Sequence, residues 1–340
     1  MQKNNINLPI TYTKLSNGLR AVIAQDHSSP VATVAVFYQV GFRSEIKGRT
    51  GFAHLFEHLM FQGTKNIPKN QFIKLIEETG GIVNGTTQPD FTNYFETLPA
   101  QAVDMALWIE FERMINPQIT QSELDNQRDV VKNEIKVNVL NRPYGGFPWI
   151  DMSEKAFTNW QNNHNGYGDM EDLSAASIKD VKSFYSDYYN PSNATIVVTG
   201  DVNPNDVIKK IEELFSQIPV KKLVTEPDLT EPQQKKESKY YKTDPLAPKP
   251  ALCIAYHAPP RMSDDFFALG LFDQMFIQGE DSLLNKVLVR EKGITDDIFG
   301  GISFEGNMFT SKDPMLWHFS MIYDDVNSSE QIIKFIDQLL

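Results

Sequence analysis

One short, nearly apolar stretch constrains this chain more than any other feature of its sequence. Between Thr50 and Gly63 the chain has six large apolar side chains and four polar ones, the polar ones being His54, Glu57, His58 and Gln62. Thr50 can cap a helix here and Gly63 can end it. A helix this apolar is buried, and burying two imidazoles and a carboxylate is costly unless they have partners. A metal ion is the simplest partner.

The spacing of these polar residues suits a divalent metal. His54 and His58 are four residues apart, so both project from one face of the helix, and Glu57 flanks them. Two neutral imidazoles on one face can hold zinc, with the carboxylate close enough to handle a proton. The alternative is a helix with two capped or half-exposed histidines and a solvated glutamate.

A zinc site that performs catalysis needs a third protein ligand and an open fourth position. The best candidate is Glu134, in a helix predicted over residues 121–140 and opened by the capping-box residues Thr120 and Glu123. The apolar stripe of this helix comprises Val130, Val131 and Val137. Glu134 falls on the same stripe, where a carboxylate should be paired or bound to a metal. The alternative is a glutamate at the edge of an exposed helix face.

The rest of the chain carries both strand and helix patterns. Strands are predicted at residues 10–25, interrupted by an Asn17-Gly18 turn, and at 31–40, 82–98 and 195–199; helices are predicted at 69–78, 99–115, 178–189 and 204–218. This mixture indicates an α+β fold, in which layered domains have a mixed, largely antiparallel sheet with helices packed on one face.

The length of 340 residues exceeds what one core usually organises. We expect a catalytic zinc-binding domain at residues 1–218, a linker rich in proline, lysine and glutamate at 219–249, and a second domain of similar type at 250–340. The linker has one strand-like pattern, at residues 239–242. The chain stops inside a helix predicted at residues 328–340. This end indicates an incomplete second domain, from a truncated chain, a proteolytic product or an incomplete gene product.

Composition narrows the classes of partner. The net charge of −12 argues against nucleic acid. No apolar run is long enough to span a bilayer, and the segment Met1-Gln2-Lys3-Asn4-Asn5 has no apolar signal core. The single cysteine, Cys253, excludes an internal disulfide and lies in an apolar, strand-like run typical of a core.

These motifs resemble a known family, the pitrilysin, insulinase and mitochondrial processing peptidase group of zinc peptidases. In that family the motif H-x-x-E-H, which defines the inverzincins, lies on one helix, and a glutamate follows on a second helix about 75 residues later. In this chain 75 residues lie between His58 and Glu134. Further similar stretches are residues 41–45, 51–54, 61–64, 80–87, 128–134, 190–202 and 279–293. Where the family often has a second glutamate, seven residues before the ligand glutamate, this chain has Gln127, which can at most hydrogen-bond a ligand.

The resemblance implies a zinc-dependent endopeptidase of half-length bacterial type that hydrolyses short or unfolded peptides. It places Zn²⁺ on His54, His58 and Glu134, with Glu57 as the general base that activates water. It also makes an edge strand with Asn84, Gly85 and Thr86 the candidate for binding extended substrate. The alternatives for these three residues are a turn followed by a plain sheet strand, or a glycosylation sequon.

The resemblance carries expectations about assembly as well. Family peptidases enclose substrate between two halves, and this chain supplies at most one, so we expect a homodimer or a heterodimer with a related subunit. The alternative from another class is a non-catalytic, peptide-binding or scaffold subunit of a related peptidase complex. The presence of Glu57 beside the three ligands favours the enzyme, since a scaffold needs no general base. The resemblance favours the periplasm over the cytoplasm.

Overall fold

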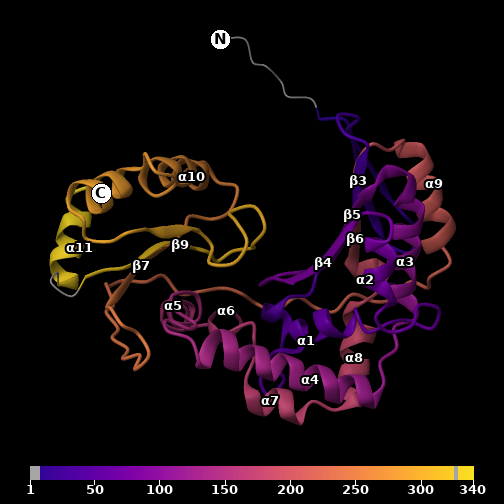
Figure 1. Ribbon diagram of the computed structural model, residues 1–340, viewed down its shortest axis with the longest axis horizontal. Coiled ribbons are helices and arrows are strands. Elements are labelled where there is room, and N and C mark those ends of the chain that lie inside the picture. Colours follow the sequence, from indigo (N-terminus) through magenta and orange to yellow (C-terminus); the bar gives the residue numbers. More distant parts are fainter. Residues whose placement is uncertain (1–7, 325–327) are drawn as a thin grey trace. The chain divides into compact units, whose positions relative to one another are not determined.

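A computed structural model describes residues 8–324 and 328–340 (Figure 1). The chain forms two compact units. The first runs to Lys132 and again from Gly166 to Glu226; the second comprises Asn133–Asn165 and Pro227–Leu340. The N-terminal segment for which the sequence predicts no signal core, Met1–Asn5, lies outside the described residues. The division into residues 1–218, 219–249 and 250–340 stays a prediction.

The first unit is built on a six-stranded sheet. Its strands are β1 Ile10–Lys14, β2 Arg20–Gln25, β3 Val31–Tyr38, β4 Ile82–Thr87, β5 Thr92–Pro99 and β6 Ala194–Gly200, in the order β1-β2-β6-β3-β5-β4. Neighbouring strands are antiparallel except for the parallel pair β2 and β6. The mixed, largely antiparallel sheet predicted from the sequence is confirmed. In this sheet β4 is an edge strand that pairs with β5 alone.

The centre of this sheet is apolar because β-branched residues alternate along its central strands. Val34 and Val36 of β3 and Ile196 and Val198 of β6 are fully buried. Helices α3 (Val103–Ile115) and α9 (Pro204–Phe215) pack on the sheet from the same side, as Figure 1 shows. The buried residues of α9 are Val207, Ile211 and Phe215, spaced four apart, which is the spacing of a single helix face.

The first unit contains further helices besides α3 and α9. They are α1 Phe52–Leu59, α2 Gln71–Glu77, α7 Met170–Ala175, α8 Ile178–Tyr188 and most of α4, Gln121–Ile135, which continues as a π-helical turn to Leu140. The helices predicted at residues 69–78, 99–115, 121–140, 178–189 and 204–218 are all present, most with shorter bounds. The sequence did not predict α7, nor α5 and α6 of the second unit. These three helices have eight or fewer residues, too few to show a clear hydrophobic period.

The second unit contains a three-stranded antiparallel sheet with helices. The order is β7-β9-β8, with β7 at Ala251–His257, β8 at Phe299–Ile302 and β9 at Leu316–Ile322. The other elements are α5 Trp149–Ala156, α6 Trp160–Asn163, α10 Asp264–Phe276, a π-helical segment Asn285–Glu291 and α11 Ser329–Asp337. Aromatic residues Phe266, Phe276, Trp317 and Phe319 form the centre of its core. This unit has the α+β type predicted for it.

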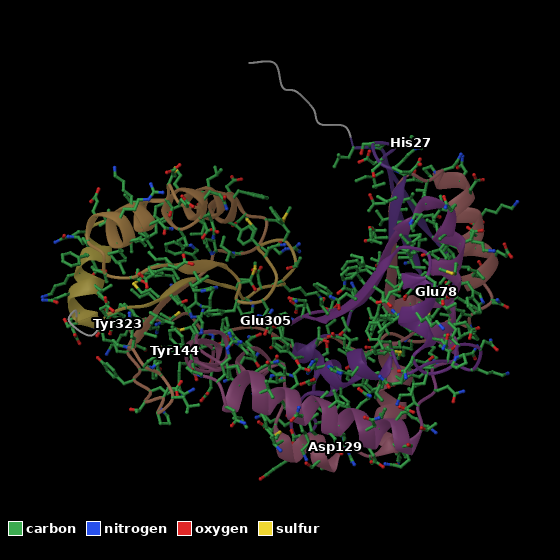
Figure 2. All side chains as sticks on the ribbon, viewed as in Figure 1. His27, Glu78, Asp129, Tyr144, Glu305 and Tyr323 are labelled. Carbon is green, nitrogen blue, oxygen red and sulfur yellow. The ribbon has the colours of Figure 1, made fainter. Side chains whose placement is uncertain are left out.

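The predicted strand at residues 239–242 is wrong, because this segment has no regular secondary structure and pairs with no strand in the described part of the chain. Side chains hold the surrounding chain to the second unit instead. Glu231 accepts hydrogen bonds from the backbone N–H groups of Thr158 and Asn159. Tyr144, labelled in Figure 2, donates its hydroxyl to the Lys249 carbonyl at 2.8 Å. Among the described residues, no helix is both long and apolar enough to cross a bilayer.

Candidate metal centre

Helix α1 is fixed on its apolar side by aromatic packing. Phe52 and Phe56 are buried and both contact Phe184 of α8, with ring centroids 5.9 and 4.9 Å apart. With that side held in the core, the other side of the helix presents His54, Glu57 and His58. The hydrophobic pattern of the helix therefore determines which way its three polar residues point.

Acidic side chains, and not Thr50, cap the start of α1. The N-cap residue is Gly51, in the left-handed conformation with φ 80°, and it has no side chain to offer. The Glu45 carboxylate accepts hydrogen bonds from the N–H groups of Gly51 and Ala53 at 3.0 and 2.9 Å. Thr50 donates its own N–H and hydroxyl to Asp172 of α7. The prediction of Thr50 as the cap is wrong, because a buried carboxylate six residues upstream of Gly51 satisfies these N–H groups.

The two imidazoles face each other across one turn of α1. Their Nε2 atoms are 3.2 Å apart and the rings are close to perpendicular, at 83°. Zinc bonded tetrahedrally to two nitrogens at 2.0–2.1 Å would separate those nitrogens by about 3.3 Å. The observed separation of the Nε2 atoms thus fits two ligands of one zinc ion.

Glu134 of α4 lies with the two histidines. His54, His58 and Glu134 each offer one potential ligand atom, and these three atoms all lie within 4.8 Å of one another. In residues 8–324 and 328–340 this is the one group of three His, Cys, Asp or Glu residues with that property. Two neutral nitrogens and one carboxylate form a donor set that zinc prefers. The residues therefore fit the ion, although their role as ligands remains a proposal.

The apolar stripe predicted for the Glu134 helix is wrong in one respect. Val130 and Val137 are 41% and 56% exposed, so they do not form a buried stripe with Val131. The buried positions of α4 are instead Leu124, Gln127, Val131 and Ile135. Glu134 is half-buried at the border of this stripe. Valines on both sides of the helix made the exposed side look apolar.

Gln127 lies on the buried stripe of α4, two turns before Glu134, and is only 5% exposed. A position seven residues away on an α-helix returns to nearly the same face. This placement agrees with a supporting role toward the ligand, which stays a prediction.

Glu57 is held against strand β4. The Thr87 hydroxyl donates to its Oε2 at 2.7 Å. At Gly85 a Cβ atom would lie 3.3 Å from Cγ of Glu57 and 3.0 Å from Cε2 of Phe61, so the missing side chain makes room for Glu57. The glutamate that the sequence predicts as general base thus packs against the edge of the sheet.

The three predicted substrate residues lie together on β4. Asn84 is exposed, and its side-chain oxygen accepts the N–H of Gly85 at 2.8 Å. Thr86 donates its hydroxyl to Asn93 of the neighbouring strand β5. The alternative of a turn does not hold, because all three residues are in the strand. Their role in binding substrate stays a prediction.

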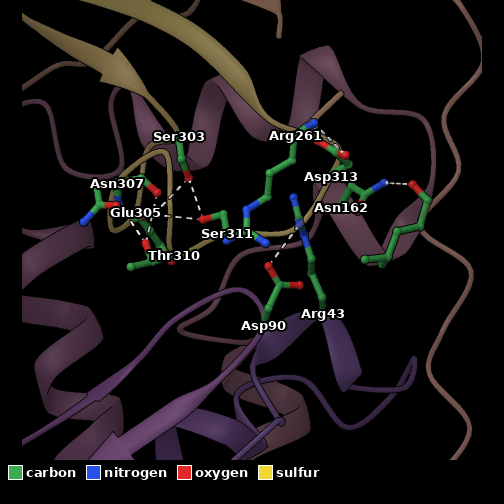
Figure 3. Close-up of polar contacts among 11 residues, drawn as sticks. Arg43, Asp90, Asn162, Arg261, Ser303, Glu305, Asn307, Thr310, Ser311 and Asp313 are labelled. Atoms are coloured by element: carbon green, nitrogen blue, oxygen red, sulfur yellow. Dashed lines mark hydrogen bonds and ion pairs between the residues drawn. The ribbon is translucent and has the colours of Figure 1, made fainter. Parts of the chain in front are cut away.

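Three contacts in the first unit were not predicted from the sequence. The Tyr167 ring meets the His54 ring edge to face, with centroids 5.1 Å apart. Its neighbour Gly168 lies against Gly51, where a Cβ atom would come within 2.3 Å of a backbone nitrogen. Buried Arg43 and Asp90 form an ion pair at 3.4 Å (Figure 3). The contact of Tyr167 could have been suspected from the Gly-Tyr-Gly run at residues 166–168, because glycines allow close packing. The run does not identify the residue on which Tyr167 packs.

Comparison with known proteins identifies the family. Residues 20–143 match the model of the insulinase family, peptidase family M16, and residues 175–340 match the model described as the peptidase M16 inactive domain. The zinc protease PqqE of Helicobacter pylori is 29% identical over 288 residues, which cover 84% of this chain and 65% of that protein. A probable mitochondrial-processing peptidase subunit beta of Arabidopsis thaliana is 25% identical over 61% of this chain and 38% of its own length.

A solved structure agrees with the sequence comparisons. The crystal structure of a protease from Helicobacter pylori superposes with a TM-score of 0.90 and 26% identity, covering 98% of this chain and 79% of that one. This chain therefore spans just under two thirds of the PqqE sequence and most of the solved protease chain. The two family models together match most of its residues. The chain belongs to the insulinase family of zinc proteases, peptidase family M16.

Proposed function

We propose that this chain is a zinc-dependent endopeptidase that hydrolyses short or unfolded peptides. The observation that carries the proposal is the 3.2 Å separation of the His54 and His58 Nε2 atoms, with Glu134 in the same cluster. The position of Glu57 adds to it, because a carboxylate beside two zinc-type ligands is what peptide hydrolysis by activated water requires. A purely structural zinc site would be closed by a fourth protein ligand.

When bound, zinc supplies Lewis acidity: it lowers the pKa of a water molecule to about 7 and stabilises negative charge on the substrate carbonyl oxygen. The chain's own contribution is proton transfer and orientation. Glu57 takes the proton of the attacking water and passes it to the departing amine, so one carboxylate serves both halves of the reaction. His54, His58 and Glu134 would hold the ion, and Thr87 contacts Glu57.

Substrate binds in the extended form along β4. An edge strand offers one row of backbone groups to another chain, and Asn84, Gly85 and Thr86 are the residues that would present them. The Gly85 N–H now donates to the Asn84 side chain. A peptide carbonyl would take the place of that amide oxygen, and Asn84 would then be free to turn toward the peptide. Backbone pairing explains why the substrates are unfolded or short: a folded protein has few free strands.

We infer that the working enzyme contains a second subunit, either another copy of this chain or a related one. One observation supports the inference: a relative from Arabidopsis thaliana is named as a subunit of a peptidase, the mitochondrial-processing peptidase. A native mass at twice the chain mass would identify the homodimer; full activity from a strict monomer would contradict the inference.

One observation favours a second candidate, a non-catalytic peptide-binding or scaffold subunit of a related peptidase. The model that matches residues 175–340 is described as an inactive domain. That region contains none of His54, Glu57, His58 and Glu134, which all lie within the region matched by the insulinase model. The enzyme is thus the better proposal.

A peptide-library digest with and without a chelator, combined with elemental analysis, tests the proposal. The enzyme should contain one zinc per chain and cleave unstructured peptides, and the chelator should stop cleavage until zinc is restored. Zinc-loaded protein that cleaves nothing, but still binds peptides, would favour the scaffold subunit. Protein that binds no zinc would overturn both the metal centre and the peptidase.

A further inference from the structure

Two residues on one face of β4 contact the side chain of Glu57. Gly85 and Thr87 are two apart in a strand, so they point to the same side of the sheet. The Thr87 hydroxyl donates to Glu57 Oε2 at 2.7 Å and lies 3.4 Å from the carbonyl oxygen of Ala53, one turn earlier in α1. Gly85 leaves the space that the Glu57 stem fills. The strand therefore determines where the carboxylate of Glu57 lies.

The Thr87 hydroxyl is itself well anchored. Threonine is β-branched, so its first side-chain torsion has few choices in a strand. Thr87 pairs with Thr92 of β5, and Thr92 is fully buried and donates its own hydroxyl to the Val40 carbonyl at 2.8 Å. A glutamate, by contrast, has three rotatable bonds and needs an outside partner to stay in one orientation.

We propose that Thr87 is the positioning residue for Glu57, and that its hydroxyl holds the carboxylate in reach of the attacking water. The proposal rests on the peptidase function above and adds a residue to it. General-base catalysis needs the base within hydrogen-bond reach of the proton, and a misplacement of about 1 Å can cost about 100-fold in rate. Because Gly85 and Thr87 belong to the strand proposed to pair with substrate, one strand would place both the peptide and the base.

Two substitutions separate the hydroxyl from the shape of the side chain. Thr87→Val keeps the branched shape and removes the donor, whereas Thr87→Ser keeps the donor. We expect Thr87→Val to lower kcat about 10- to 100-fold, with KM within about threefold of wild type and zinc content unchanged. We expect Thr87→Ser to restore kcat to within about threefold of wild type. A loss of general fold integrity would change zinc content and KM as well.

A matched control comes from the same sheet. Thr33 of β3 and Thr97 of β5 share a hydroxyl hydrogen bond at 2.8 Å, and both are half-buried. Thr33→Val removes an equivalent hydroxyl contact away from Glu57 and should leave kcat and KM as in wild type. If Thr33→Val lowers kcat as much as Thr87→Val does, the loss is not specific to Glu57 and the proposal is overturned.

A double-mutant cycle in denaturant unfolding gives a second measurement that does not depend on activity. Thr87→Val and Glu57→Ala should be non-additive, because each removes the same hydrogen bond. Additive effects, or a Thr87→Val enzyme with wild-type kcat, would overturn the role of Thr87 but not the proposed peptidase function. A wild-type protein without zinc-dependent hydrolysis would overturn the peptidase function and the role of Thr87 with it, so the two failures can be told apart.

Discussion

The Nε2 atoms of His54 and His58 lie 3.2 Å apart, and the two residues are one helical turn apart in α1. Two neutral imidazoles that face each other through nitrogen lone pairs repel, unless a proton or a cation lies between them. The packing of Phe52 and Phe56 in the core fixes α1 so that both imidazoles lie on the opposite side of the helix. Either a shared proton or a bound cation satisfies this contact, and the first two predictions test the cation.

Removing one imidazole should remove the metal. His58→Ala leaves two protein ligands, which is too few for a stable zinc site, so stoichiometric zinc should be lost together with hydrolysis. Elemental analysis of the purified variant measures this directly. His27→Ala is the matched control, because His27 is largely exposed and pairs with Asp201. Equal zinc in His58→Ala and wild type would refute the assignment of this ligand.

Glu57→Gln should separate binding from chemistry. The amide keeps the size of the side chain and can still accept the Thr87 hydrogen bond, but it takes no proton from water. We expect zinc content as in wild type and a loss of kcat of roughly 10²- to 10⁴-fold, the usual range for a general base. Steady-state kinetics on a library-derived peptide provide the measurement. A variant that still cleaves at the wild-type rate would remove Glu57 from the mechanism.

A cluster of buried charged residues, Glu96, Glu110 and Arg113, lies in the first unit. Arg113 is completely buried, forms a 2.7 Å ion pair with Glu110 and lies 3.6 Å from Glu96. Its guanidinium carbon also lies 4.4 Å from the centre of the Tyr94 ring. Burial, followed by the nearby Glu110, holds the pKa of Glu96 well above its usual range.

Arg113→Met should therefore destabilise the first unit strongly. It removes the cation that pairs with the buried Glu110, and breaking a buried pair in this way costs about 3–5 kcal/mol. Chemical denaturation followed by tryptophan fluorescence would show it as a lower midpoint. Lys74→Met, in the exposed pair with Glu78, should stay within about 0.5 kcal/mol of wild type. If the two substitutions lower the free energy of unfolding by the same amount, the buried cluster stabilises the protein no more than an exposed ion pair does.

Acid should weaken the second unit through His318. This residue is 8% exposed, and its ring stacks on Phe304 at a centroid distance of 3.7 Å. Its Nδ1 is buried without a hydrogen-bond partner. Burial lowers the pKa of His318 from 6.5 to about 4. The nearby loop is ordered by hydroxyl contacts such as that between Ser303 and Ser311 (Figure 3).

The sign of the effect follows from the lowered pKa. Below about pH 6.5 the unfolded chain binds a proton at His318 that the folded chain does not, so stability is complete above this pH and falls towards pH 4. The difference amounts to about 3 kcal/mol at the acid end. Denaturant midpoints between pH 7 and pH 4 should fall less steeply in His318→Phe than in wild type. His27→Phe, a change at an exposed histidine, should follow the wild-type curve, and parallel curves for all three would disprove this role of His318.

Much of the fold could be predicted because it depends on local patterns. The alternation of β3 and β6, the four-residue spacing in α9 and the apolar run of α1 each follow from neighbours along the chain. The pair His54 and His58 belongs to the same class, since four residues on any helix return to one face. Short helices such as α6 and α7 were missed because they carry less than two turns of pattern.

The sequence by itself thus determined the helix with two imidazoles and a carboxylate on one side, and the strand that contains Asn84, Gly85 and Thr86. Only the tertiary structure decided which face of α4 is buried, that Glu45 caps α1, and that Thr87 reaches Glu57 thirty residues away. The reason is physical. Spacing along one element fixes directions within that element, whereas a contact between elements depends on how their side chains pack, and several packings satisfy the same pattern.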